Sequence, residues 1–116
     1  MNLLFVCSGN TCRSPMAEVI ALAQMRAAGG FGKSAVTSAG LAACPGDPAN
    51  PASVRVCAEH GLDLTSHRSK SLTTDLIEAS DHIYTMTQGQ ALQLKRILPQ
   101  YAAKVSPLIP DDDVKD

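Results

Sequence analysis

A cysteine and an arginine lie near the start of the chain, separated by five residues, in the stretch Val6-Cys-Ser-Gly-Asn-Thr-Cys-Arg-Ser-Pro15. The small, turn-prone residues between them allow the backbone to curl, so that successive N–H groups point inward and form a nest for an oxyanion. Arg13 can hold two phosphate oxygens with its planar guanidinium, and the same positive environment favours the thiolate form of Cys7. The spacing therefore predicts a nucleophile beneath a phosphate-binding loop made of Ser8, Gly9, Asn10, Thr11, Cys12 and Arg13.

Ser14 and Pro15 follow this loop and predict the start of a helix, with Ser14 as the N-cap and Pro15 in the first turn. The positive end of that helix adds to the field that attracts an anion. Ser14 is also close enough to donate a hydrogen bond to the Cys7 sulfur. The alternative is that Cys7 is a small buried hydrophobe, which is the usual state of a free cysteine. Arg13, the small loop residues and the Ser-Pro pair all lie where an anion site needs them. Their presence favours the interpretation of Cys7 as part of an anion-binding site.

The elements that must position this loop alternate between strands and helices. Short apolar or β-branched runs predict strands at residues 2–7, 35–38, 82–87 and 104–109. Capping residues and helical spacing predict helices at residues 15–28, from 51 to the Gly61 stop, after Thr73 or Thr74, and at 88–98. This order predicts one α/β domain over residues 1–116, a doubly wound, open, parallel four-stranded sheet with helices on both faces. The anion-binding loop would follow the first strand, where ligands bind in such folds.

The composition excludes several classes of function. The 10 Lys and Arg residues are balanced by 11 Asp and Glu, so there is no basic field for nucleic-acid binding. The apolar run at the start, Leu3 to Cys7, is too short to cross a bilayer and lacks a preceding positive segment, so no membrane anchor or signal peptide is expected. Four cysteines are too few for a disulfide scaffold, and a cytoplasmic protein with free thiols is expected.

A zinc site is the other chemistry that the cysteines could suggest. Cys7 and Cys12, together with Cys57 and His60, could be drawn as four ligands. Cys57, however, falls on the apolar face of the second expected helix, and the anion loop already accounts for the first pair. No metal or other cofactor is therefore expected.

The stretch Phe5-Val-Cys-Ser-Gly-Asn-Thr-Cys-Arg-Ser-Pro-Met-Ala-Glu18 closely resembles the signature of the low-molecular-weight protein-tyrosine-phosphatase family. The resemblance continues along the chain in Thr37-Ser-Ala-Gly40, His60-Gly61, His67-Arg-Ser-Lys70 and Tyr84-Thr-Met-Thr87. Members of the family have the doubly wound sheet and hydrolyse phosphoproteins without a metal. The resemblance thus implies phosphorylated proteins as partners, and a monomer is expected.

The resemblance also implies roles for individual residues. Cys7 would be the nucleophile that forms a phosphocysteine, Arg13 and the loop amides would bind the phosphoryl oxygens, and Ser14 would stabilise the thiolate. A polar network that holds the loop in shape would consist of Asn10, Ser38 and His67. Without the resemblance, a single loop histidine such as His67 is more often exposed or satisfied than functional.

Cys12 has two readings. Family members often use this cysteine to form a reversible disulfide with the nucleophile, Cys7, which protects it from over-oxidation. Sequence alone equally allows Cys12 to be a small residue packed under the loop.

The general acid is expected at the end of the chain. Such an acid must protonate the leaving group and later activate water, and the family supplies it from an Asp-Pro in a late loop. The end of this chain, Asp111-Asp-Asp-Val-Lys-Asp116, has no Asp-Pro, and the chain is expected to lack the family's final loop and helix. Spacing from the last strand makes Asp116 the best match, with Asp111, Asp112 and Asp113 as rivals. A merely solvated acidic tail is the other reading.

The expected function is hydrolysis of phosphotyrosine or phosphoarginine. Many phosphotyrosine-specific members have a bulky Ile or Leu where this chain has Thr11, which resembles the protein-arginine-phosphatase branch. Two alternatives remain open. An arsenate reductase would need two further cysteines near the third strand, and Ser80 to Gln90 contains none. A non-catalytic module that binds phosphate or phosphoproteins would be favoured by a missing acid loop.

Overall fold

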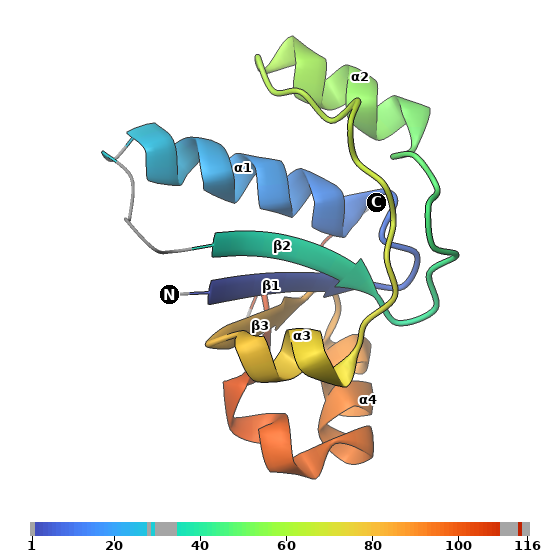
Figure 1. Ribbon diagram of the computed structural model, residues 1–116, viewed down its shortest axis with the longest axis vertical. Coiled ribbons are helices and arrows are strands. Elements are labelled where there is room, and N and C mark those ends of the chain that lie inside the picture. Colours follow the sequence, from blue (N-terminus) through green and yellow to red (C-terminus); the bar gives the residue numbers. More distant parts are fainter. Residues whose placement is uncertain (1, 28, 30–34, 110–113, 115–116) are drawn as a thin grey trace.

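The computed structural model describes residues 2–27, 29, 35–109 and 114 of the 116-residue chain. Its four parallel strands form one sheet in the order β2-β1-β3-β4 (Figure 1). The strands are β1 (Asn2–Cys7), β2 (Ala35–Gly40), β3 (His82–Thr85) and β4 (Val105–Pro107). Because β1 lies between β2 and β3, its carboxyl end has backbone on both sides. Cys7 pairs with Gly40 of β2, and Val6 pairs with Thr85 of β3.

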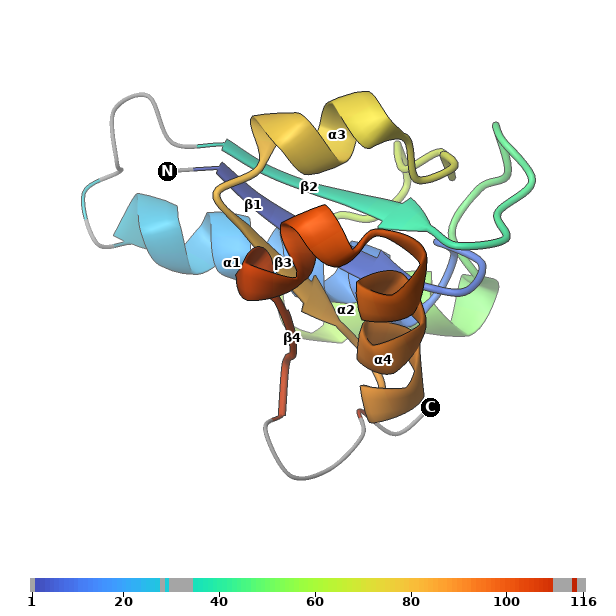
Figure 2. The ribbon, with the colours of Figure 1, turned by 90° about the horizontal axis from the view of Figure 1, so that it is seen from below.

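Helices cover both faces of the sheet. On one side lie α1 (Arg13–Ala27) and α2 (Pro51–Glu59), and on the other lie α3 (Thr74–Ala79) and α4 (Gln88–Ile97) (Figures 1 and 2). A 3-10 helix, η1 (Pro99–Lys104), links α4 to β4. This arrangement confirms the predicted doubly wound fold. Within the described ranges, no helix is long and apolar enough to cross a membrane.

Successive residues of β1 enter opposite halves of the core, as the alternation of a strand requires. Leu4 and Val6 are fully buried among side chains of α3, α4 and the neighbouring strands. Phe5 and Cys7 face the other way and pack with Met86 and with partly buried side chains of α1. A strand buried on both faces needs a continuous apolar run, which explains the composition of this segment. The alternation also places the Cys7 side chain on the α1 side of the sheet.

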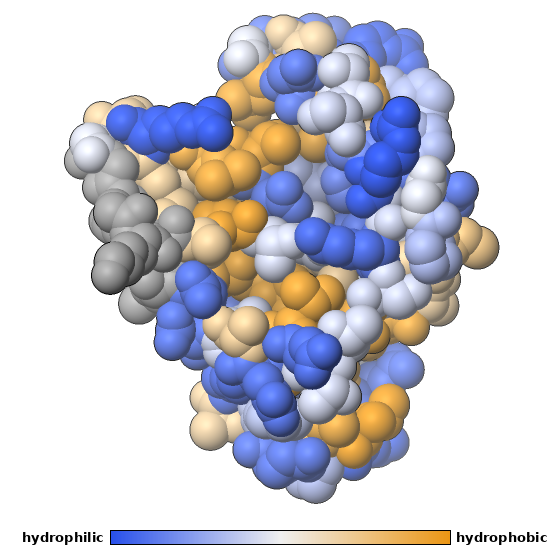
Figure 3. Space-filling model, viewed as in Figure 1, coloured by the Kyte–Doolittle hydropathy of each residue, from blue (hydrophilic) through white to orange (hydrophobic). Residues whose placement is uncertain are grey.

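A smaller cluster attaches α2 to α1. It consists of Ala49, Cys57 and Leu64, with Met16 and Val19 of α1 packed against it. Figure 3 shows hydrophobic side chains at the surface between the two helices. Burial raises the pKa of the Cys57 thiol above its ordinary value of 9.0, because desolvation disfavours the thiolate. Cys57 is therefore a neutral part of this cluster.

Polar side chains begin three helices at the places that the sequence predicts. The Asn50 side chain accepts a hydrogen bond from a backbone N–H of α2, and Thr73 does the same for α3. Thr87 and Gln90 form a reciprocal capping box at the start of α4. These caps fix where the connecting segments leave the carboxyl edge of the sheet.

The start of α1 differs from the prediction. The helix begins at Arg13, so Ser14 lies inside its first turn and is not the N-cap. The reason is that the Ser14 hydroxyl is engaged by Cys7 and Asn10.

The strand boundaries also differ from the predictions. β2 extends two residues further, to Gly40, while β3 stops at Thr85 because Thr87 is taken up as the cap of α4. β4 is shorter than expected, and the residues before it form η1, which begins at Pro99. Proline suits the first turn of a helix because its φ is fixed and it needs no hydrogen-bond acceptor there.

Candidate active site

The loop between β1 and α1 surrounds the Cys7 thiol with hydrogen-bond donors. Cys7 is the last residue of β1 and is 3% exposed. Its Sγ lies 2.9 Å from Ser14 Oγ, and the backbone N–H of Asn10 donates to the same sulfur over 3.2 Å. These contacts hold the sulfur in one position at the base of the loop. The structure thus brings Cys7 and Ser14 together at the junction where the sequence predicts a nucleophile.

Asn10 is the centre of the loop. It is fully buried and has a φ of 55°, the left-handed region that asparagine tolerates better than most residues. Its side-chain Nδ2 donates to Ser14 Oγ (3.0 Å) and to Ser38 Oγ (2.9 Å). Its Oδ1 accepts the backbone N–H of Lys70 (2.9 Å). The predicted association of Asn10 with Ser38 is therefore present.

Two serine hydroxyls take part in these contacts, and the direction of the Ser38 hydrogen is determined by its partners. Ser38 Oγ donates to Glu18 Oε1 over 2.6 Å, so Ser38 can only accept from Asn10. Ser14 Oγ likewise accepts from Asn10, and in its contact with the Cys7 sulfur either atom can be the donor; Ser14 donates when Cys7 is a thiolate. Glu18, at the end of the quoted motif, thus acts at the far end of this chain of hydrogen bonds. The sequence predicts no role for Glu18, because nothing in its spacing shows that it reaches Ser38.

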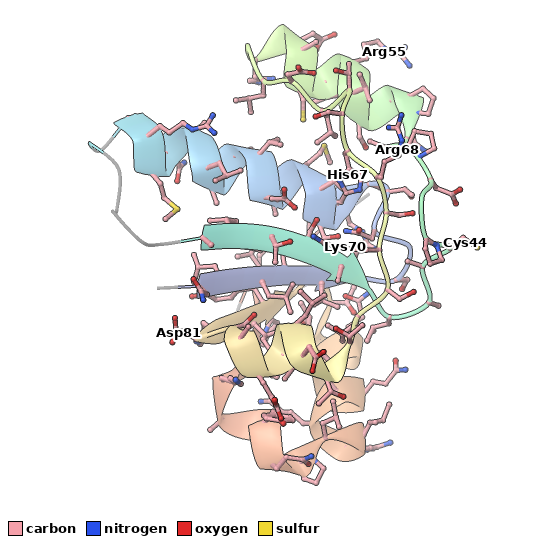
Figure 4. All side chains as sticks on the ribbon, in the orientation of Figure 1. Cys44, Arg55, His67, Arg68, Lys70 and Asp81 are labelled. Carbon is pink, nitrogen blue, oxygen red and sulfur yellow. The ribbon has the colours of Figure 1, made fainter. Side chains whose placement is uncertain are left out.

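The segment after α2 supports the loop from outside. His67 Nε2 lies 2.7 Å from the backbone oxygen of Asn10, a distance at which a ring N–H donates to the carbonyl. Figure 4 shows His67 and Lys70 where this segment runs from α2 towards the carboxyl end of β2 and the start of α1. The His67 side chain is half-buried. The His67 ring therefore contacts a backbone carbonyl of the loop, and among the described contacts it has none with Cys7.

The end of β2 approaches the loop closely. The backbone N–H of Leu41 donates to Cys7 O (2.9 Å), and that of Ala42 donates to Ser8 O (2.8 Å). A Cβ on Gly40 would lie 2.7 Å from Ser8 O, closer than such atoms can come. Glycine at this position therefore lets β2 pack directly against the loop.

The other loop residues are fixed mainly through their backbone. Thr11 O accepts the N–H of Asn50 over 2.7 Å, which ties the loop to the start of α2. Gly9 and Thr11 are half-buried, and Ser8 is exposed. The Ser8 hydroxyl accepts a hydrogen bond from Gln90 Nε2 over 3.1 Å. Gln90 was missed as a site residue, although its position in the capping box could have drawn attention to it.

All four cysteines are thiols in the structure. Cys12 is half-buried, and its Sγ accepts a hydrogen bond from Ser53 Oγ of α2 over 3.3 Å. Cys44 is exposed in the segment after β2, and its label in Figure 4 lies at the edge of the molecule. The expected pairing of Cys12 with Cys7 stays a prediction.

Arg13 reaches the end of the described chain. One of its guanidinium nitrogens, Nη1, donates to Val114 O over 3.1 Å, and the Val114 N–H donates to Met86 O over 2.8 Å. Asp111, Asp112, Asp113 and Asp116 lie outside the described residues. The assignment of a general acid among them therefore stays a prediction.

Known proteins resemble this chain over most of its length. A family model described as low molecular weight phosphotyrosine protein phosphatase matches residues 2–113. The probable low molecular weight protein-tyrosine-phosphatase EpsP of Ralstonia solanacearum is 39% identical over 103 residues, which are 89% of this chain and 67% of EpsP.

Two solved structures have the same fold. A low molecular weight protein tyrosine phosphatase from T. tengcongensis superposes with a TM-score of 0.91 at 38% identity, over 100% of this chain and 81% of its own. A mutant YwlE arginine phosphatase, with serine in place of a cysteine and that active site serine phosphorylated, superposes with a TM-score of 0.87 at 35% identity. That match covers 93% of this chain and 69% of YwlE. The chain therefore belongs to the low molecular weight phosphotyrosine protein phosphatase family.

Proposed function

We propose that the chain hydrolyses phosphorylated protein side chains with Cys7 as the nucleophile. The observation that carries this proposal is the position of the Cys7 sulfur. Cys7 ends a parallel strand, and its sulfur lies 2.9 Å from Ser14 Oγ in the first turn of α1 and accepts a hydrogen bond from the Asn10 N–H. A sulfur held in this way is a strong nucleophile and also a good leaving group. Both properties are needed if an intermediate is to form and then break down.

The reaction has two steps. In the first, the Cys7 thiolate attacks phosphorus, the bond from phosphorus to the leaving oxygen or nitrogen breaks, and an acid protonates the leaving group. In the second, water attacks the phosphocysteine, the sulfur–phosphorus bond breaks, and inorganic phosphate leaves. Arg13 and the loop N–H groups hold the phosphoryl oxygens in both steps. The phosphorylated active site serine in the YwlE mutant supports such an intermediate.

Asp116 is our candidate for the acid. Val114, the nearest described residue, accepts a hydrogen bond from Arg13. This contact supports the view that the end of the chain approaches the phosphate site. Asp111, Asp112 and Asp113 are the alternatives, and substitution of each residue separates them.

The substrate is proposed as phosphotyrosine or phosphoarginine, the two chemistries named among the relatives. Thr11 is half-buried in the loop, and its hydroxyl leaves more room than a branched alkyl chain. Hydrolysis of matched peptides that carry either group tests the choice. If Thr11 favours phosphoarginine, Thr11→Ile lowers the ratio of kcat/KM for phosphoarginine to that for phosphotyrosine. An unchanged ratio would show that Thr11 does not determine the preference between the two substrates.

Residues 1–116 are proposed to act as one domain and as a monomer, because one sheet joins all the described strands and the proposed site uses residues of one chain. The four thiols support a reducing compartment, the cytoplasm.

The direct test compares turnover with binding. The parent chain should hydrolyse an activated aryl phosphate, while Cys7→Ser should lose turnover and still bind inorganic phosphate, because Arg13 and the loop amides remain. Equal turnover by the two proteins contradicts the proposal. Phosphate binding by a parent that hydrolyses neither aryl phosphate nor phosphopeptides favours the binding-module alternative.

A further inference from the structure

Gln90 connects α4 to the phosphate-binding loop. It lies in the first turn of α4 and is 7% exposed. Its Oε1 accepts the backbone N–H groups of Met86 (3.0 Å) and Thr87 (3.1 Å), while its Nε2 donates to Ser8 Oγ (3.1 Å). Because two backbone donors hold Oε1, the side-chain amide cannot be turned round. Nε2 is therefore the atom that faces Ser8.

This contact limits what the Ser8 hydroxyl can do. A hydroxyl has one hydrogen to donate, and here its oxygen already accepts from Gln90, so the hydrogen is directed to another acceptor. The backbone of Ser8 is held by Ala42 and packs against Gly40. Ser8 directly follows Cys7 and is exposed, whereas Cys7 is buried. The hydroxyl hydrogen of this exposed side chain is therefore available to an acceptor that binds at the loop.

We propose that Gln90 is a positioning residue, which directs the Ser8 hydroxyl hydrogen towards an oxygen of the phosphoryl group bound in the loop. Ser8 then supplies a side-chain donor in addition to Arg13 and the loop amides. The inference rests on the proposed function in taking the bound anion to be the phosphoryl group of a substrate. The same hydrogen bond would hold inorganic phosphate, so it can be measured without turnover.

A purely structural role for Gln90 makes a different prediction. The capping of α4 uses Oε1 and leaves Nε2 for Ser8. Gln90→Glu keeps an oxygen for the Met86 and Thr87 N–H groups, but it replaces Nε2 with an oxygen that cannot donate. The Ser8 hydroxyl would then donate to the new carboxylate and be lost to the phosphate. A helix cap alone would be nearly unaffected by this change.

The experiment is a double-mutant cycle read out by phosphate binding. The dissociation constant for inorganic phosphate is measured by calorimetry for the parent, Ser8→Ala, Gln90→Glu and the double variant, and kcat/KM for an aryl phosphate is measured in parallel. Each single change should weaken phosphate binding about tenfold, the usual effect of losing a hydrogen bond to a charged group. The double variant should bind no more weakly than Gln90→Glu alone, because both changes remove the same donor.

Two controls separate the loss of the directed Ser8 hydroxyl from the effects of added negative charge and of altered side-chain size. Gln93→Glu adds the same charge on an exposed position of α4 and should leave phosphate binding within about twofold of the parent, because solvent screens exposed charges. Ser8→Thr keeps a hydroxyl and should retain more phosphate affinity than Ser8→Ala does. Thermal melting of every variant shows whether the fold is retained.

Several results overturn the inference. The inference is wrong if Ser8→Ala binds phosphate as tightly as the parent. It is also wrong if the losses of phosphate affinity in the two single variants simply add in the double variant. A Gln90→Glu protein that melts lower but binds phosphate normally shows that Gln90 is only a cap. A parent that binds no phosphate overturns this inference and the proposed function together. Coupled phosphate binding without turnover upholds the inference and contradicts the proposed function alone.

Discussion

Asn10 and Ser14 are joined by a hydrogen bond of 3.0 Å from the Asn10 side-chain amide to Ser14 Oγ. This bond occupies one acceptor position of the hydroxyl, and the hydroxyl hydrogen remains available to Cys7 Sγ, 2.9 Å away, when Cys7 is a thiolate. Asn10 also donates its own backbone N–H to the sulfur. One buried residue thus acts on the proposed nucleophile both directly and through Ser14.

Ser14→Ala should slow the reaction without preventing phosphate binding. Loss of a hydrogen bond to a charged sulfur is expected to lower kcat about 10- to 100-fold. Alkylation of Cys7 by iodoacetate at neutral pH, followed by mass spectrometry, should slow as well. Ser53→Ala is the matched control, because Ser53 is a buried serine that contacts Cys12 and not Cys7. Equal losses in the two variants would show that Ser14 acts only through packing.

Mild peroxide should inactivate the protein reversibly if Cys12 protects Cys7. The peroxide oxidises Cys7 to a sulfenic acid, the Cys12 thiol displaces water to form a disulfide, and an added thiol reductant reduces that bond. Mass spectrometry should then find a Cys7–Cys12 bond. Cys12→Ser should recover less activity than the parent, whereas Cys44→Ser, which changes an exposed thiol, should recover as the parent does. Full recovery by Cys12→Ser rules out the protective role.

Asp116→Asn should matter most for substrates whose leaving group departs poorly. General acid catalysis is typically worth about 10²- to 10⁴-fold, and least where the leaving group is already stable. The ratio of aryl to alkyl phosphate hydrolysis should therefore rise in this variant. Asp111→Asn, Asp112→Asn and Asp113→Asn are the comparisons. If one of them raises the ratio and Asp116→Asn does not, the acid is that residue.

Cys57 should contribute to stability only while it is protonated. Its pKa is raised by burial in the folded protein, so the folded state retains the proton more tightly than the unfolded chain does. This contribution is complete below the ordinary value of 9.0 and is lost as the pH rises above it. Urea unfolding between neutral pH and pH about 10 should show a smaller alkaline loss for Cys57→Ala than for the parent. Parallel losses would show that another group is responsible.

The sequence predicted the strands, the loop and their order because these depend on local patterns. The run from Leu4 to Cys7 is buried on both faces, Asn50 and Thr73 begin helices at their expected places, and α4 begins at Gln88 as predicted. The proximity of Asn10 and Ser38 was implied by the family resemblance alone, since 28 residues separate them in the chain.

The contacts that orient the loop could not be predicted from local patterns or from the family resemblance. Glu18 reaches Ser38 across the face of β2, and Gln90 reaches Ser8 from a helix 82 residues later in the chain. Glutamate and glutamine are common on exposed surfaces. The residue type at these two positions therefore does not show whether the side chain makes such a contact or is exposed to solvent. The start of α1 was misplaced for a related reason. Ser14 has the chemistry of a helix cap, but its hydroxyl is used by the tertiary partners Cys7 and Asn10.

Trapping the intermediate tests the central claim most directly. The protein is mixed with an aryl phosphate, quenched in acid within the first turnovers, digested and examined by mass spectrometry. The account predicts one phosphoryl group on the peptide that contains Cys7, attached to its sulfur, and none on that peptide in Cys7→Ser. Hydrolysis at the parent's rate with no phosphate on Cys7, or with phosphate on another residue, would contradict it.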